Sequence, residues 1–148
     1  MLLTIDVGNT NITMGVFRET ELLGMFRMTT KRPRTSDEYG FTICGILEHR
    51  SIDPKKIQAV IIASVVPDIM HSLTSAVIKY LDTVPLIVSS ESDTGIRVIT
   101  DNPSRTGPDR IVNAVAGYAI AKGPAIVIDF GRATTYDLIG PERTLAAC

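Results

Sequence analysis

The amino-acid sequence predicts an α/β fold built on a mixed sheet, and three observations carry that prediction. Short β-branched runs alternate with longer segments of helical periodicity, short turns join the first three runs, and the last two runs repeat the plan of the first two. The chain has 148 residues, of which 45% are hydrophobic, so it can bury a core of ordinary size. The expected order is β-β-β-α-β-α-β-α, followed by two further strands.

The chain begins with three predicted strands at residues 2–7, 11–18 and 21–30. The first is an apolar run, and the next two follow after short turns of polar residues. Strands joined in this way favour an antiparallel meander.

The middle of the chain alternates helices and strands. Thr35 stands three residues before Glu38, which is the pattern of a capping box at the start of a helix. The β-branched segment 57–67 predicts a buried strand, segment 68–81 has apolar residues at helical spacing, and segment 85–90 predicts another strand.

The last part of the chain begins with a long polar segment, residues 91–110, rich in Gly, Pro, Asp and Ser. Polar segments of this length in a compact domain are more often functional than idle. A helix of small residues is expected at 111–121, and strands at 125–130 and 134–139 form a hairpin.

This order predicts two domains of unequal completeness. Residues 1–121 are expected to form the first domain, and residues 122–148 the first hairpin of a duplicated second domain. A hairpin alone is marginally stable. The sequence is therefore expected to be shortened relative to its own internal repeat.

Charge and hydropathy exclude several classes of protein. The formal net charge of -1 argues against nucleic acid as a partner. No apolar run reaches the ~18 residues of a membrane span, and no secretory leader is recognisable. We expect a cytoplasmic protein with no membrane partner.

The stretch "DVGNTN" is the first candidate site. Asp6 ends a buried strand, Gly8 permits a tight turn, and residues 9–11 offer side-chain donors beside backbone N–H groups. These groups suit the phosphates of a nucleotide, and Asp6 suits Mg²⁺. An ordinary hairpin turn is the alternative, because Asn, Gly and Thr are common turn residues.

The stretch "DFGRATT" repeats this arrangement from Asp129 onward, with a buried strand before it and a hairpin partner after it. Two such units could hold one nucleotide between them. The repeat resembles the acetate and sugar kinase, heat-shock ATPase and actin superfamily, whose halves each carry an acidic, glycine-containing phosphate loop.

A third candidate lies between the two repeats, where Asp109 and Arg110 follow Gly107-Pro108 at the entry to a helix. A carboxylate can accept the proton of a hydroxyl, and a guanidinium can hold an acid group with two hydrogen bonds. The alternative is structural: Asp109 caps the helix and Arg110 is a solvated residue of its first turn.

In order and spacing, "DVGNTN", "GPDRIVNAVAGY" and "DFGRATT" resemble the motifs of the type III pantothenate kinases, from Met1 to about Ile139. The tail "PERTLAAC" continues that pattern poorly. The resemblance implies a ribonuclease H-like sheet, phosphorylation of pantothenate to 4'-phosphopantothenate with ATP and Mg²⁺, a monovalent cation (K⁺ or NH₄⁺), and a homodimer. This is the first step of coenzyme A synthesis.

The resemblance also implies roles for individual residues. Asp109 is the general base, and Asp129 binds the monovalent cation. The residues expected to bind pantothenate are Thr100, Gly107, Pro108, Asp109 and Arg110. The residues expected to bind ATP are Asp6, Val7, Gly8, Asn9, Thr10, Asn11, Ile12, Thr13 and Arg132.

Two departures from the family pattern leave a second hypothesis open. The family has Thr where this chain has Arg132, and usually Tyr where it has Thr100. With the expected truncation, these changes favour a non-catalytic or regulatory relative, or an inactive fragment. The isolated chain is accordingly expected to bind ATP weakly and to turn over little pantothenate.

Overall fold

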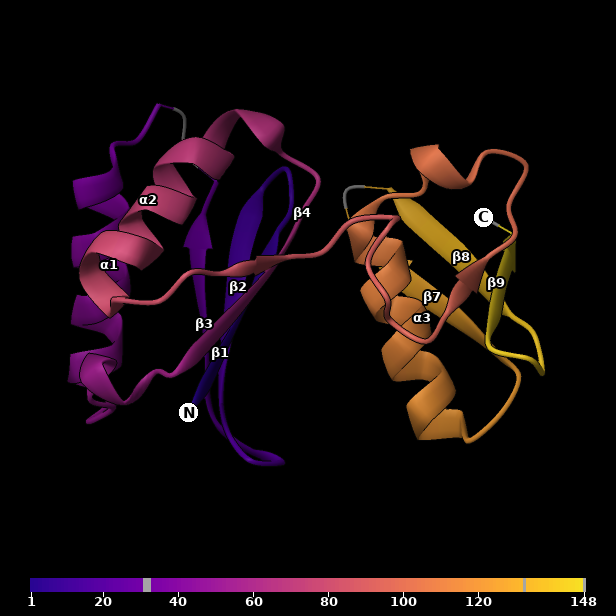
Figure 1. Cartoon of the computed structure of the whole chain (residues 1–148), viewed down its shortest axis with the longest axis horizontal. Coiled ribbons are helices and arrows are strands. Elements are labelled where there is room, and N and C mark those ends of the chain that lie inside the picture. The colour runs from indigo at the N-terminus through magenta and orange to yellow at the C-terminus, as the bar shows by residue number, and fades with distance from the viewer. Residues whose placement is uncertain (31–32, 132, 148) are drawn as a thin grey trace. The chain divides into compact units, whose positions relative to one another are not determined.

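A computed structural model describes residues 1–30, 33–131 and 133–147. The chain divides into two compact units, Met1–Ile87 and Val88–Cys148. Each unit is described by itself (Figure 1). Within the described residues, no helix is long and apolar enough to cross a membrane.

The first unit is built on a five-stranded mixed sheet with the order β3-β2-β1-β4-β5. β2 pairs antiparallel with both β1 and β3, which confirms the expected meander, and β4 pairs parallel with β1. The bounds of the strands are β1 Leu2–Val7, β2 Asn11–Arg18, β3 Glu21–Thr29, β4 Ala59–Ser64 and β5 Leu86–Ile87.

Alternation along β1 decides which face of this sheet is covered. Leu3, Ile5 and Val7 are buried in the core, whereas Asp6 is exposed. Successive side chains of a strand point to opposite faces, so Asp6 lies on the face opposite the core. Helices α1 (Ser36–His49) and α2 (Met70–Leu81) lie together on one side of the sheet (Figure 1).

The start of α1 confirms the predicted capping box. The Thr35 hydroxyl accepts a hydrogen bond from the backbone N–H of Glu38, and a Glu38 carboxylate oxygen accepts one from the backbone N–H of Thr35. Two otherwise unpaired N–H groups are thereby satisfied. α2 begins later than the sequence indicates, because residues Pro67–Ile69 form a 3₁₀ turn before it.

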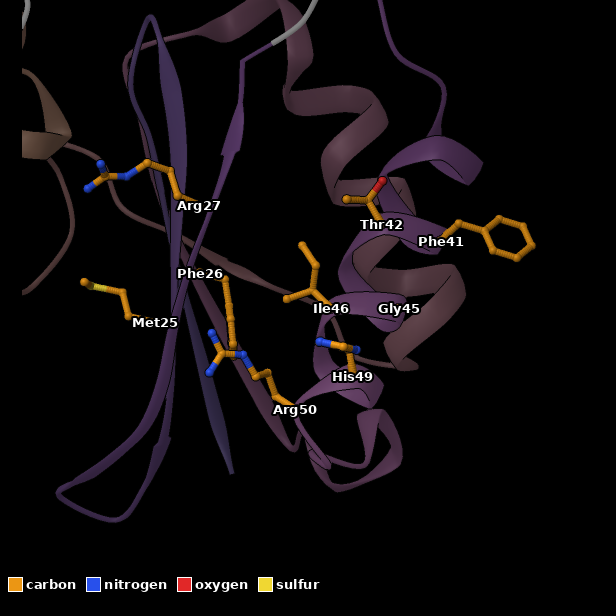
Figure 2. Close-up of a pocket in the computed structure, with 9 residues that line it drawn as sticks. All are labelled: Met25, Phe26, Arg27, Phe41, Thr42, Gly45, Ile46, His49 and Arg50. Carbon is orange, nitrogen blue, oxygen red and sulfur yellow. The ribbon is translucent and has the colours of Figure 1, made fainter.

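A shallow groove of about 630 Å³ lies between β3 and α1 (Figure 2). The ring of Phe26 lies under the guanidinium of Arg50, whose central carbon is 5.8 Å from the ring centre. The lining residues are Met25, Phe26, Arg27, Phe41, Thr42, Gly45, Ile46, His49 and Arg50. None of them belongs to the predicted sites.

The second unit has a four-stranded sheet with the order β6-β9-β8-β7, on which helix α3 (Pro108–Ala121) packs. The hairpin predicted at 125–130 and 134–139 is confirmed residue for residue as β7 Ala125–Phe130 and β8 Thr134–Ile139. A second 3₁₀ turn, Pro103–Arg105, precedes α3, and another, Pro54–Lys56, precedes β4 in the first unit.

Two strands of this sheet were not expected. β6 (Arg97–Val98) lies within the polar segment, and β9 (Thr144–Ala147) lies within the tail. β9 pairs antiparallel with β8 and parallel with β6, so short segments distant in sequence complete each other's hydrogen bonds. Strands that depend on such distant partners are too short to show a recognisable strand pattern in the local sequence.

The boundary between the units also differs from the expected one, which followed residue 121. α3 belongs with the second unit, because Gly117 of this helix lies against Val127 of β7 and Ile139 of β8. Ala114 is fully buried with Ile139 and Leu145 in the same small core. Helix α3 therefore covers the second sheet.

Candidate active site

The turn between β1 and β2 is tightly held by its own backbone. The Gly8 N–H donates to the Asn11 carbonyl at 2.9 Å, and a Cβ added at Gly8 would lie 3.2 Å from that same oxygen. A larger residue would crowd this turn, whereas glycine leaves room for a close backbone approach. The Asn9 and Thr10 side chains are exposed at its tip.

Thr30 holds this turn from the end of β3. Its backbone N–H donates to the Thr10 carbonyl at 2.9 Å, and its hydroxyl donates to the Gly8 carbonyl at 2.7 Å. The turn is therefore fixed on both sides. Sequence reasoning did not single out Thr30, because this contact joins residues 22 positions apart.

The other residues expected to bind ATP divide by burial. Val7 and Ile12 are buried, so only their backbone groups are available to a ligand. Asp6 and Thr13 face each other across the antiparallel pair, on the face opposite the helices. Arg132 lies outside the described residues.

The first turn of α3 rules out the simple capping alternative for Asp109. The helix begins at Pro108, its N-cap is Gly107, and no side chain makes a capping hydrogen bond there. The Oδ1 atom of Asp109 is buried and has no hydrogen-bond partner among the described residues. A buried carboxylate oxygen without a partner is costly, which is typical of functional sites.

Arg110 is not a solvated residue either. Its Nε donates to Oδ1 of Asp137 at 2.7 Å, and its Nη2 lies 2.7 Å from the same oxygen. Nη2 also donates to the carbonyl of Tyr136 at 3.2 Å. The guanidinium is thus bound along one edge to β8, which restricts the two-bond substrate grip expected for Arg110.

Asp129 joins the same group of residues. The amide of Asn113 donates to Oδ2 of Asp129 at 3.3 Å, connecting α3 with the end of β7. Burial raises the pKa of Asp137, the Arg110 guanidinium acts in the opposite direction, and the negative charges of Asp109 and Asp129 add to the rise. The second unit therefore gathers three carboxylates and one guanidinium around the start of α3.

The remaining residues expected to bind substrate lie on the approach to this helix. Thr100 is half-buried, and its hydroxyl lies 3.1 Å from the hydroxyl of the buried Thr106. Gly107 and Pro108 are half-buried at the helix start. The structure thus connects Thr100 to the segment before α3 through Thr106. Asp109, Arg110 and Asp129 belong to the cluster of charged residues around the start of α3.

Sequence reasoning missed Asp137 and Asn113. One signal was available for each: Asp137 occupies a buried position in the alternation of β8, beside Ile139, and Asn113 stands one helical turn after Asp109. Among the described residues, no group of three or more His, Cys, Asp or Glu side chains is arranged to hold a metal ion.

Comparison with solved structures defines the class of fold. A crystal structure of a proposed N-acetylglucosamine kinase from Porphyromonas gingivalis superposes with a TM-score of 0.51 at 16% identity, covering 96% of this chain and 45% of that chain. The expected α/β fold with a mixed sheet is confirmed, and the chain shares its fold with that sugar kinase.

Sequence comparison then defines the family. A family model described as type III pantothenate kinase matches residues 2–147, so the chain belongs to that family. The match includes almost all of the tail, and the expectation that the resemblance ends near Ile139 was wrong.

Two curated relatives agree with this assignment. The type III pantothenate kinase of Agathobacter rectalis is 52% identical over 144 residues, covering 97% of this chain and 55% of the relative. That of Listeria innocua is 49% identical over 136 residues, covering 92% and 52%. The chain spans about half the length of the curated relatives it matches.

Proposed function

We propose that this chain serves a kinase that transfers the γ-phosphoryl group of ATP to the hydroxyl of pantothenate, giving 4'-phosphopantothenate and ADP. The observation that carries this proposal is the family match over residues 2–147, which includes both phosphate-loop motifs and the Asp109 segment. This is the reaction of the first step in coenzyme A synthesis.

The turn from Gly8 to Asn11 is the proposed binding site for the phosphates of ATP. Its closed backbone, held by Thr30, supports preorganised donors, and such positioning supplies most of the catalysis in phosphoryl transfer. Mg²⁺ would accompany the phosphates, and the exposed Asp6 carboxylate offers the oxygen ligands that this ion takes.

Asp109 is the proposed general base. Its buried, unpartnered Oδ1 is a suitable acceptor for the proton of the pantothenate hydroxyl. As the hydroxyl oxygen bonds to the γ-phosphorus, the bond from that phosphorus to the bridging oxygen breaks and ADP leaves. Arg110 would provide positive charge to the substrate carboxylate.

Asp129 is the proposed ligand of a monovalent cation, K⁺ or NH₄⁺. Its carboxylate is exposed at the end of β7, and Asn113 orients one of its oxygens. Carboxylate oxygens are the kind of ligand that hard cations take. A cytoplasmic homodimer also belongs to this proposal and rests on the family membership.

A non-catalytic relative is the second candidate. It is favoured by the replacements at Thr100 and Arg132, where the family pattern has Tyr and Thr. Such a protein would bind pantothenate or ATP without turnover.

A coupled ADP-release assay with ATP, pantothenate and K⁺ tests the proposal. We expect slow ADP release that requires pantothenate and is lost in Asp109→Asn. Binding of pantothenate by calorimetry without ADP release would favour the non-catalytic relative. Absence of both pantothenate binding and pantothenate-dependent ADP release would reject the proposed function for this chain.

A further inference from the structure

The contact between Arg110 and Asp137 joins the first turn of α3 to the middle of β8. Asp137 is completely buried, and the Arg110 side chain is 18% exposed. Charged side chains are rarely buried unless they are paired and hydrogen-bonded. Asp137 therefore binds the Arg110 guanidinium in a largely buried position, where water and other polar groups have little access to it.

The contact also decides which guanidinium nitrogens remain available. Nε and Nη2 both face Oδ1 of Asp137, and Nη2 reaches the Tyr136 carbonyl as well. Arg has five N–H donors in a rigid plane, and Nη1 carries two of them. Among the described residues, Nη1 has no hydrogen-bond partner.

Asp137 is itself fixed in place. It lies in β8, between β9 and β7, and stands opposite Val127 in the antiparallel register. Its second oxygen, Oδ2, is buried and has no hydrogen-bond partner in the described part of the chain. An isolated buried carboxylate would be unfavourable, and the Arg110 guanidinium is the charged partner that offsets this cost.

We propose that Asp137 is a positioning residue that fixes the Nε–Nη2 edge of Arg110, so that Nη1 alone is presented to one oxygen of an anionic substrate group. This inference rests on the proposed function, because it makes the carboxylate of pantothenate that group. Asp137 touches no substrate atom in this scheme and acts through Arg110.

One consequence concerns the geometry of recognition. A free guanidinium can bind a carboxylate with two parallel hydrogen bonds through either its Nε–Nη2 edge or its Nη1–Nη2 edge. Asp137 occupies the first edge, and the Tyr136 carbonyl engages Nη2 of the second. Arg110 then recognises a single oxygen in a fixed direction. Loss of Asp137 would leave the positive charge of Arg110 in place, but the orientation of its guanidinium would no longer be fixed.

The first experiment tests this anchor without any substrate. The ¹⁵N–¹H signal of Arg110 Nε should show slow exchange with water in the unaltered chain, and fast exchange in a folded Asp137→Ala variant. Circular dichroism establishes that each variant is folded, and Asp137→Asn keeps the side-chain size if the alanine variant fails to fold. A protected Nε signal in both folded variants would overturn the inference.

The second experiment separates positioning from a merely structural role. Calorimetry compares pantothenate with pantothenol, in which a primary alcohol replaces the carboxylate. In Asp137→Ala or Asp137→Asn we expect pantothenate affinity to fall about 10-fold, since a hydrogen bond to a charged group is lost. Pantothenol affinity should change less than about twofold.

Glu142→Gln is the matched control. It removes an exposed carboxylate of the same unit, whose contact with Arg97 is also an ion pair. An equal fall in affinity for both ligands in the Asp137 variants would overturn the inference, because a structural role predicts that result. If the unaltered chain binds neither ligand, the proposed function fails and the substrate assignment with it, while the Nε signal still decides whether the anchor exists.

Discussion

The side-chain amide of Asn113 donates a hydrogen bond to Oδ2 of Asp129 across 3.3 Å. It joins the motif on α3 to the second acidic-glycine motif, which are separate stretches of the sequence. The orientation of the proposed cation ligand therefore depends on a helix residue 16 positions earlier.

We expect Asn113→Ala to raise the K⁺ concentration needed for half-maximal activity about 10-fold or more, because Asp129 then loses its orienting hydrogen bond. Loss of a group that orients a metal ligand typically costs about 10- to 100-fold in affinity. A K⁺ titration of ADP release measures this. Ile120→Ala changes a residue of the same helix that is 83% exposed and should leave the titration unchanged. An unaltered K⁺ requirement in Asn113→Ala would separate Asn113 from the cation site.

Asp109→Asn should lower the rate of phosphoryl transfer by about 100-fold or more, since the amide cannot accept the hydroxyl proton. The melting temperature should stay close to that of the unaltered chain. Asp101→Asn, at an exposed position of the same segment, is the control and should retain the rate. Retained transfer in a folded Asp109→Asn variant would remove Asp109 from the base role.

Thr30→Val should weaken ATP binding, because it removes the hydroxyl that donates to the Gly8 carbonyl while conserving side-chain shape. The lost hydrogen bond is worth about 1 kcal/mol, or roughly fivefold in affinity if the turn loosens only in the free protein. Nucleotide titration by calorimetry measures the change. Thr30→Ser should restore affinity, and Thr29→Val, at the exposed neighbour, should have no effect.

Gly117→Ala should destabilise the second unit. A Cβ at this position would lie 2.4 Å from Cγ2 of Val127 and 3.0 Å from Cδ1 of Ile139, so α3 must move from the sheet. We expect a loss of about 1–3 kcal/mol in the free energy of unfolding, measured by urea denaturation. Gly45→Ala in α1, where nothing lies within 4 Å, should instead be neutral or stabilising. Equal effects of the two changes would contradict this packing.

The Asp137 carboxyl should give the chain an unusual pH dependence. Its pKa is raised above the ordinary value of 3.8, chiefly by burial, so the folded state holds this proton more tightly than the unfolded state. Its contribution to stability is therefore present below 3.8 and is lost as the pH rises through the folded pKa.

The Asp137→Asn variant cannot titrate at this position and should lack that loss. The free energy of unfolding of the variant, minus that of the unaltered chain, should rise across this pH range. Urea denaturation at a series of pH values measures the difference, with Glu142→Gln as the exposed control. A flat difference would mean that the pKa of Asp137 is not raised.

Much of the secondary structure could be predicted from local patterns. The capping box at Thr35, the meander of β1 to β3 and the hairpin of β7 and β8 each depend on neighbouring residues, and each was predicted correctly. β6 and β9 could not be predicted, because each is short and is stabilised by partners distant in sequence.

Residue type and spacing along the chain were enough to predict Asp6, Asp109 and Asp129 as site residues and to indicate the family, which the family match bears out. How the charges are paired depends on the tertiary structure. Arg110 is bound to Asp137, and Asp129 to Asn113, because packing α3 on the second sheet brings together residues 27 and 16 positions apart. The sequence shows which chemical groups are present and how they are spaced along the chain. Their burial and the distances between side chains in the fold decide which of them remain available to a substrate.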